Sequence, residues 1–410
     1  MEVVHDKCAG LDVHQHTVVA CVRVAAGGKV TQEVRTFDTT TKGLLALCDW
    51  LAEYGCTHAA MESTGVFWKP VWHVLESSFE LVLANAMHIR NLPGRKTDVN
   101  DAMWIADLLA HGLIRASFVP PTPVQELRDL TRTRKQLVRE IAQHTQRIQK
   151  TLEDANIKIT GVISNVLGMS GRTLLDALVA GETDPERLVE LTRGRLKASR
   201  SELVEALRGR VRDHHRFLLK LHLAQIDALT AAVRDVEGRV GETLTPFRER
   251  TSLLTTMPGI SETTANVIVS EIGIDMSRFP TAGHLVSWAG LCPRNDESAG
   301  KRRSTRLRKG APWLKTSLVQ AAWGAVRKKD CYLRAQFLRL KSRRGPMKAI
   351  VAVAASMLTA AYHILRDGVP YRELTGAYFD KRDRSKLTKR LLRRLADIGV
   401  HVDIRTVPAP

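Results

Sequence analysis

Short apolar runs alternate with amphipathic stretches through the first hundred residues of the chain. Helical spacing of apolar side chains predicts helices at Thr41–Tyr54 and near Trp68–Leu75. Strands are predicted where apolar and β-branched residues cluster between turns, at Lys7–Asp12, Thr17–Val24, Val30–Phe37, Thr57–Met61 and Glu80–Ala84. Three antiparallel strands followed by alternating helices and strands are the element order of a RuvC-like, ribonuclease H-like α/β fold.

Within the stretch Gly94–Leu109 a further helix is predicted, because apolar residues recur at helical spacing through Leu109. Thr97 or Asp98 can cap its first turn. Asp98 and Asp101 lie three residues apart, so a helix places both carboxylates on one side. Two such carboxylates make half of a divalent-metal site. Taken alone, the pair is better explained as a helix cap, because acids favour the N-terminal end of the helix dipole.

Two more acidic residues stand at strand ends. Asp12 follows the apolar run Cys8–Leu11, and Glu62 follows His58–Met61. Each acid alone is explained by a solvated strand terminus. In a ribonuclease H-like sheet, however, both come to the edge that a later helix approaches with Asp98 and Asp101. Four carboxylates gathered there would repel one another unless a divalent cation lay between them, which favours a two-metal cluster.

The apolar spacing then changes to that of long helices. Alternating three- and four-residue steps run over Val124–Ile157 and again over Glu202–Val240. Between them, Thr160–Ser199 contains several glycines and an Asp-Pro breaker, and it is predicted to be a helical insertion. The two long helices predict an antiparallel coiled coil that serves as an arm or a dimer contact. A plain helical bundle is nearly as compatible with the pattern.

The last third of the chain is predicted to be mostly helical. Leu253–Ile268 contains a Pro258-Gly259 turn between apolar runs, which predicts a helix-hairpin-helix whose second helix presents amides to a DNA phosphate. A Pro-Gly turn also joins many pairs of helices that bind no ligand. The apolar run Ala349–Leu365 is short for a membrane span and contains Ser, Thr and His, so it is predicted to be a buried helix.

These patterns predict four parts: an α/β catalytic domain, a helical arm with an insertion at about 160–199, a mostly α C-terminal domain and a basic tail. Their predicted bounds are 1–122, 123–250, 251–375 and 376–410.

Charge changes this picture by indicating a partner. The 410 residues carry a formal net charge of +19, which favours a polyanion, nucleic acid before a membrane surface. Aromatic residues make up only 5%, so stacking on unpaired bases is not expected to dominate. The six cysteines show no CxxC spacing, which argues against a zinc site or a disulfide framework. Without an apolar signal region, the sequence predicts a cytoplasmic, nucleoid-associated protein.

One basic segment lies between two apolar helices and follows a Ser-Ala-Gly turn that contains Ser298. Nine positions hold six cations: Lys301, Arg302, Arg303, Arg306, Arg308 and Lys309. A charge run is usually a solvated face, and Ser298 by its spacing is an ordinary loop serine. Cations placed in this way could also neutralise phosphates and stabilise a pentavalent phosphorus. The amphipathic run Lys381–Arg394 is a second basic stretch, suited to nucleic acid or a membrane surface.

Five short motifs occur in a familiar order along the chain. They are Gly10–His14, Met61–Gly65, Lys96–Ala102, Met257–Ile260 and the segment Ala289–Gly300. In this order the chain resembles the transposases of the insertion-sequence one-ten family, which have a RuvC-like DEDD domain and a C-terminal serine-bearing domain and are related to the Piv DNA invertases. The resemblance covers roughly residues 1–120 and 250–370.

The resemblance implies a two-part active site. Asp12, Glu62, Asp98 and Asp101 match the acidic tetrad, which binds Mg²⁺, with Mn²⁺ as a substitute. Ser298 matches the nucleophile that joins DNA through a phosphoserine. We expect nucleic-acid contacts from Lys96, Gly259, Arg294 and the six cations of the basic segment.

The resemblance also implies the reaction and the partners. Family members excise and insert a mobile element, guided by a structured bridge RNA that pairs with donor and target DNA. They act as dimers of dimers with sites shared between subunits, and no membrane is involved. Thr160–Ser199 departs from compact members by its length.

Three alternatives stay open at this point. A RuvC-like junction nuclease would need the tetrad and a metal-activated water, without a serine adduct. A non-enzymatic nucleic-acid-binding protein would need the charge alone. A tyrosine nucleophile is less favoured, because the tyrosines lie away from the Ser-Ala-Gly turn.

Overall fold

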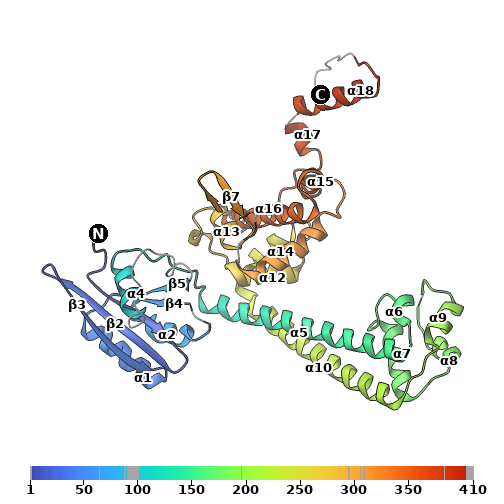
Figure 1. Cartoon of the computed structure of the whole chain (residues 1–410), viewed down its shortest axis with the longest axis horizontal. Coiled ribbons are helices and arrows are strands. Elements are labelled where there is room, and N and C mark those ends of the chain that lie inside the picture. Colours follow the sequence, from blue (N-terminus) through green and yellow to red (C-terminus); the bar gives the residue numbers. More distant parts are fainter. Residues whose placement is uncertain are drawn as a thin grey trace. The chain divides into compact units, whose positions relative to one another are not determined.

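The computed structural model describes residues 2–402 except 64, 87–88, 90–100, 195, 294–295, 305, 308–309 and 383. The chain divides into two compact units, Met1–Val119 and Pro120–Pro410 (Figure 1). Each unit has its own core, and each is described separately below.

The first unit contains a mixed five-stranded sheet. Its strands are β1 (Lys7–Val13), β2 (Thr17–Ala26), β3 (Lys29–Asp38), β4 (His58–Glu62) and β5 (Glu80–Ala84). Their order is β3-β2-β1-β4-β5, with β1 to β3 antiparallel and β1, β4 and β5 parallel. The strand predictions are confirmed, and this sheet is compatible with the predicted ribonuclease H-like fold.

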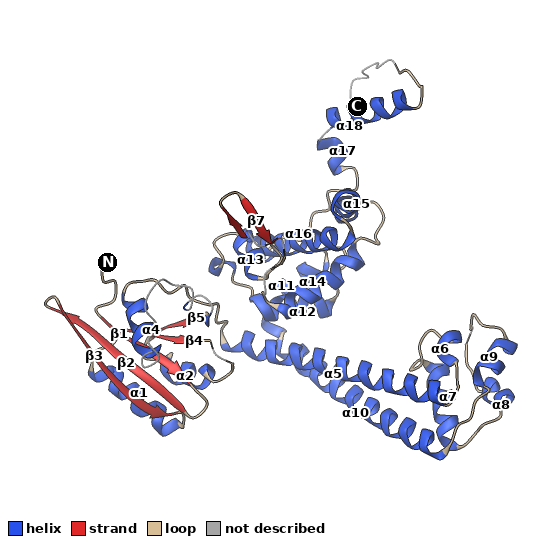
Figure 2. Cartoon of the chain, viewed as in Figure 1, coloured by secondary structure: helices blue, strands red, loops and turns tan. Residues whose placement is uncertain are grey.

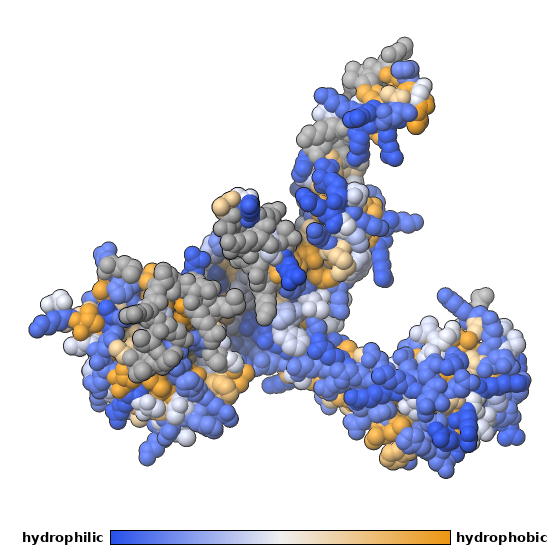
Figure 3. All heavy atoms as spheres, in the orientation of Figure 1, coloured by the Kyte–Doolittle hydropathy of each residue, from blue (hydrophilic) through white to orange (hydrophobic). Residues whose placement is uncertain are grey.

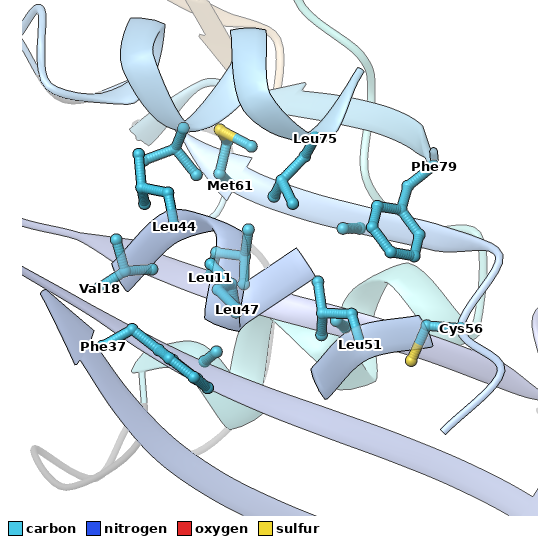
Figure 4. Packing of buried hydrophobic residues seen from close by; sticks show 14 of the residues in the cluster. Leu11, Val18, Phe37, Leu44, Leu47, Leu51, Cys56, Met61, Leu75 and Phe79 are labelled. Atoms are coloured by element: carbon cyan, nitrogen blue, oxygen red, sulfur yellow. The ribbon is translucent and has the colours of Figure 1, made fainter. Parts of the chain in front are cut away.

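Helices cover both faces of this sheet, and the size of the side chains between them determines how closely each helix packs on the strands. On one face, α1 (Thr41–Glu53) and α2 (Trp68–Leu75) bury large apolar side chains, among them Leu11 and Met61 (Figure 4). On the other face, α4 (Asp101–Ala110) packs on small residues. A Cβ on Gly10 would lie 2.1 Å from the carbonyl oxygen of Ala102, so only glycine lets α4 approach β1 this closely.

Two long helices form the arm in the second unit. They are α5 (Thr122–Asp154) and α10 (Asp213–Thr243). Successive cross-helix contacts pair Arg134 with Glu237, His144 with His222, and Asp154 with His215, so residue numbers fall on α10 as they rise on α5 (Figure 1). The helices are therefore antiparallel, as expected. Their packing as a true coiled coil stays a prediction.

The end of the arm corrects one prediction. The run predicted over Glu202–Val240 is not one helix, because α9 (Arg200–Leu207) ends before α10 begins. Gly209 lies in the break, where a Cβ would stand 2.4 Å from the carbonyl oxygen of Ala155. The chain thus turns against the end of α5, and α9 packs into a core that the last turns of α5 and the first turns of α10 share. The other helices of this core are α6 (Ile159–Val162), α7 (Met169–Ala180) and α8 (Pro185–Glu190).

A histidine pair makes the arm's stability sensitive to pH. The Nδ1 atoms of His144 and His222 lie 3.2 Å apart. Burial lowers the pKa of His222 from its usual 6.5, and the charges of His144 and Arg147 lower it further. His222 therefore binds fewer protons in the folded arm than in the unfolded chain, so its contribution to stability is full above pH 6.5 and declines as the pH falls below that value.

We expect the arm to melt at a lower temperature at pH 5.5 than at pH 7.5, and His222→Gln to reduce this difference. Circular dichroism melts at the two pH values measure the effect, and His401→Gln, which changes an exposed histidine, is the matched control. An unchanged pH dependence in His222→Gln would exclude this histidine as the cause.

Several helices of the second unit pack on α16 (Pro346–Asp367): α11 (Arg248–Thr255), α13 (Ala282–Trp288), α14 (Pro312–Ala325) and α15 (Tyr332–Arg344) (Figure 2). The helix α12 (Glu262–Ile272) joins them by packing on α11 and α14. By length and composition α16 could cross a membrane, yet 56% of its apolar window is buried within the structure. Val353, Met357 and Ala361 are fully buried, so α16 is a core helix, as predicted.

A buried ion pair joins the arm to these helices. Glu271 on α12 is 1% exposed and receives two hydrogen bonds from Arg132 on α5, at 2.8 and 2.9 Å. Arg128, one turn earlier, donates to the carbonyl oxygens of Ser270 and Glu271. Because these cations close the C-terminal end of α12, the base of α5 is fixed to the helical domain.

Candidate active site

The ends of β1 and β4 bring two acidic residues together. Leu11 and Met61 are partners across the parallel strands, and Asp12 and Glu62 follow them. Leu11 and Met61 face α1 and α2, so the alternation of a strand turns Asp12 and Glu62 to the face that α4 covers. Ala84, the partner of Glu62 on β5, packs on that same face. Two carboxylates thus stand side by side at one edge of the sheet.

The direction of α4 brings its first residue toward this edge. Cys8 shares a buried cluster with Ile105–Ala110 in the later part of α4, whereas Gly10, two residues further along β1, lies against Ala102 and Ala106. The end of β1 that carries Asp12 therefore lies toward the beginning of α4, where Asp101 is the first residue. A strand rises about 3.3 Å per residue and a helix 1.5 Å, so two residues of β1 match about four residues of α4.

Of the four predicted metal ligands, the structure describes Asp12, Glu62 and Asp101. Asp98 and the predicted contact Lys96 lie outside the described residues. Among the residues that the structure does describe, no three acidic, histidine or cysteine side chains are close enough to hold a metal ion. Asp12 lies 3.2 Å from the Nε2 atom of His14, a contact that the sequence did not indicate.

The two cysteines behind the acids have a structural role. Burial raises the pKa of both Cys8 and Cys21 to about 12. Both thiols therefore stay protonated near neutral pH and act as small apolar groups under α4.

An ion pair that sequence reasoning missed holds α4 on the sheet. Arg23 on β2 is only 4% exposed, and its Nε donates to Asp107 on α4 at 2.7 Å. Gln32 on β3 donates to the same carboxylate oxygen at 3.2 Å. An arginine inside an apolar strand was the available signal, but its partner lies 84 residues away. The pair fixes the helix that carries Asp101.

Replacing Asp107 with asparagine is expected to loosen α4. The buried guanidinium of Arg23 would lose its charge partner; because Asp107 is 43% exposed, we expect a loss of about 1–3 kcal/mol. Amide hydrogen exchange of α4 should accelerate, while exchange in α1 on the opposite face should change little. Asp49→Asn on α1 is the control substitution. Equal protection of α4 in Asp107→Asn and wild type would show that the pair does not hold the helix.

Ser298 lies at the end of a strand in a small hairpin of the second unit. The sequence analysis expected a loop, but β6 (Asp296–Ser298) pairs with β7 (Lys301–Ser304) and Ser298 is the partner of Lys301 (Figure 1). Ala299 and Gly300 form the two-residue turn with φ of 48° and 73°, the left-handed pair of a type I′ turn. Alanine in this conformation costs about 1–2 kcal/mol. The strain is stored directly beside the predicted nucleophile.

The predicted phosphate contacts gather around the same hairpin. Lys301 and Arg306 are exposed, and Arg302 and Arg303 lie on β7. The predicted contacts Arg294, Arg308 and Lys309 lie outside the described residues.

The predicted helix-hairpin-helix corresponds to α11, a tight turn and α12. Gly259 in the turn has φ of 83°, and a Cβ there would lie 2.3 Å from the carbonyl oxygen of Ala321 on α14. Close packing therefore explains this glycine, and its contact with nucleic acid stays a prediction. The first turn of α12 lines a cavity of about 740 Å³ together with Arg134 and Lys135 of the arm.

The sheet order and the acids at its edge are compatible with a RuvC-like α/β enzyme domain. Comparison with protein families identifies it further. A DEDD-type family model described as "Transposase" matches residues 9–157, and a model described as "Transposase IS116/IS110/IS902 family" matches residues 251–338. The chain belongs to the insertion-sequence one-ten (IS110) family of transposases.

Individual relatives agree with this assignment. A protein of the insertion element IS110 from Streptomyces coelicolor is 26% identical over 298 residues, which cover 68% of this chain and 73% of that protein. Pilin gene-inverting proteins of Moraxella bovis and Moraxella lacunata are each 32% identical over 30% of this chain. The match spans 39% and 38% of those two proteins. DEDD transposases act on DNA and generally depend on divalent metal ions.

Proposed function

We propose that this protein is a site-specific recombinase that excises and inserts a mobile DNA element by transesterification through a covalent serine–DNA intermediate. A structured bridge RNA transcribed from the element guides it to donor and target DNA. The observation that carries the proposal is the side-by-side position of Asp12 and Glu62 on the face that α4 covers with Asp101. The second support is Ser298 in a strained hairpin inside the second family match.

The acids fit a divalent cation by their chemistry. Carboxylate oxygens are the ligands that Mg²⁺ prefers, and the ends of β1 and β4 place Asp12 and Glu62 on the face that α4 covers. We propose that Asp101 at the start of α4 and Asp98, three residues earlier in sequence, complete the site when the cation binds. Bound there, Mg²⁺ or Mn²⁺ would lower the pKa of an attacking hydroxyl and neutralise charge on phosphorus. The acids would hold the cation, and its positive charge would hold the reacting phosphate in place.

Ser298 supplies the nucleophile. Its hydroxyl loses a proton to solvent and attacks phosphorus, and the bond from phosphorus to the DNA 3′-oxygen breaks. One phosphodiester is exchanged for another, so the bond energy is conserved in a phosphoserine link. The freed 3′-hydroxyl of the new partner strand then attacks that link and releases the serine. Lys301 and the arginines of β7 neutralise the phosphates beside the reacting one.

The assembly follows from the two-part site. We propose a dimer of dimers in which the acids of one subunit act with Ser298 of another, and in which the antiparallel helices α5 and α10 contribute to the subunit contact. Each strand exchange then requires the correct oligomer, which prevents cleavage by single chains.

Recombination between two plasmids tests the function. One plasmid carries the element's junction, the other its target, and the RNA is transcribed from the DNA that flanks the reading frame. We expect junction products that need protein, RNA and Mg²⁺, that disappear with EDTA and return with Mn²⁺. Products that form equally well without RNA would remove the guide from the proposal.

A junction nuclease is the second candidate. Asp12, Glu62 and Asp101 all lie in the first compact unit, whereas Ser298 lies in the other, so the acids could act with a metal-activated water and without the serine. Such an enzyme would release 5′-phosphate ends with no protein attached. A protein that binds DNA without metal and without cleavage would instead be a non-enzymatic binding protein.

A further inference from the structure

Positive charge concentrates at the end of the chain, largely beyond the family matches, which stop at residue 338. Residues 327–348 and 378–397 together hold 17 of the 62 Lys and Arg residues but only 4 of the 43 acids. These segments account for a net charge of +13 out of the chain's +19. They correspond to the loop before α15, α15 itself, the start of α16, α17 (Tyr378–Arg382) and α18 (Arg384–Asp397).

The cations of the arm differ from these in having partners. On the arm, Arg134, Arg172 and Arg200 each lie within 3 Å of a carboxylate, so ion pairs within the fold neutralise their charge. At the end of α15, Lys341, Arg343 and Arg344 are exposed, and within the described ranges no carboxylate lies within salt-bridge distance of them. Cations without acidic partners stay available to an outside polyanion.

Aromatic contacts hold α17 on α15. The rings of Tyr332 on α15 and Phe379 on α17 stack with centroids 5.1 Å apart, and Tyr378 meets Tyr332 edge-on at 5.2 Å. The guanidinium of Arg339 lies over the Phe379 ring at 5.3 Å. A single residue separates α17 from α18, so the chain leads directly from the helix held on α15 to the basic helix α18. Figure 3 shows both hydrophilic and hydrophobic residues on the visible face of this region.

The helix α18 has two distinct sides. At 100° per residue, the exposed cations Lys389, Arg390, Arg393 and Arg394 of α18 fall within an arc of about 140°, whereas the exposed Arg384 in the first turn falls outside it. Leu391, Leu392 and Leu395 fall on the opposite arc, and Leu391 is 48% exposed. One side of α18 is therefore a row of four cations with a repeat of one helical turn.

We propose that α15, α17 and α18 form a docking surface for the phosphate backbone of duplex DNA that lies outside the reacting junction. The partner class rests on the DNA substrates of the family and not on the serine chemistry. Duplex DNA fits because its contacts are ionic and independent of sequence. Unpaired RNA is less suitable, because the aromatic rings of this region pack against one another and offer no platform for bases.

The test is DNA binding by the full chain with all four cations changed: Lys389→Gln, Arg390→Gln, Arg393→Gln and Arg394→Gln. The probes are a 40-base-pair duplex of arbitrary sequence, a structured RNA with the same number of phosphates, and vesicles with phosphatidylserine. We expect duplex binding at about 0.15 M salt to weaken at least tenfold. Each lost contact lowers the slope of log K against log salt by about 0.9, so the slope should fall by about 3 to 4.

The control variant has the same net charge. Lys42→Gln, Lys197→Gln, Lys220→Gln and Arg234→Gln remove four exposed cations from α1 and the arm, and duplex binding should weaken less than threefold. Equal effects of the two variants would overturn the proposal, because total charge would then explain binding. A larger loss for RNA would make RNA the occupant, and a loss confined to vesicles would make it a membrane surface; either result contradicts the proposal. Because the readout is binding without cleavage, failure of the serine mechanism leaves this test interpretable.

Discussion

Replacing Ser298 with alanine is expected to abolish the covalent protein–DNA adduct and to lower recombination by about 10³-fold or more, while DNA binding stays within about threefold. The reason is chemical. Alanine has no oxygen to attack phosphorus, whereas the backbone of the hairpin is set by pairing between β6 and β7 and by the turn at Ala299-Gly300. Denaturing gel electrophoresis of protein incubated with labelled junction DNA measures the adduct.

Ser304→Ala provides the matched control in the same hairpin. Ser304 pairs with Asp296 at the other end of the strands, and its hydroxyl accepts a hydrogen bond from the amide of Arg306. Its loss should perturb the loop slightly and leave adduct formation intact. A persistent adduct in Ser298→Ala, or its loss in both variants, would contradict the assignment of the nucleophile.

Replacing an acid of the proposed metal site is expected to have an effect of similar size. Glu62→Gln and Asp101→Asn each keep the volume of the side chain but remove the charge that a divalent cation needs. We expect strand exchange to fall by about 10³-fold or more in each, with binding of DNA retained. Raising Mn²⁺ should restore at most part of the activity, since the ligand itself has changed.

The control for these two substitutions is Glu80→Gln, which changes an acid outside the proposed metal site. Glu80 is the first residue of β5, whereas Glu62 is the last residue of the parallel strand β4. Glu80 therefore lies at the opposite end of these strands from Glu62, where it forms an ion pair with His58. Its substitution should leave strand exchange within about twofold. Full activity in Asp101→Asn would remove Asp101 from the metal site and leave the cluster to the other acids.

Local patterns were enough to predict the first unit. The five strands contain apolar and β-branched runs, a Gly27-Gly28 turn separates β2 from β3, and alternation along β1 and β4 determines which side chains face α4. The strand-end positions of Asp12 and Glu62 follow from the same pattern, so their adjacency in the sheet could be expected. The helix from Asp101 was predictable from its apolar spacing.

Long-range contacts explain what the sequence did not predict. Apolar spacing continues from Leu203 to Val240, and only the close approach of Gly209 to the end of α5 separates α9 from α10. The strands β6 and β7 are three and four residues long and highly polar, so they lack a strand pattern. The pair of Arg23 and Asp107 depends on how α4 crosses the sheet, which no local pattern encodes.

The central claim is that Ser298 becomes covalently joined to DNA. Protein trapped on junction DNA in the presence of Mg²⁺ can be digested with protease and nuclease, and the nucleotide-bearing peptide sequenced by mass spectrometry. We expect a phosphodiester on the hydroxyl of Ser298. A nucleotide on another residue, or cleaved DNA with free 5′-phosphate ends and no modified peptide, would contradict it.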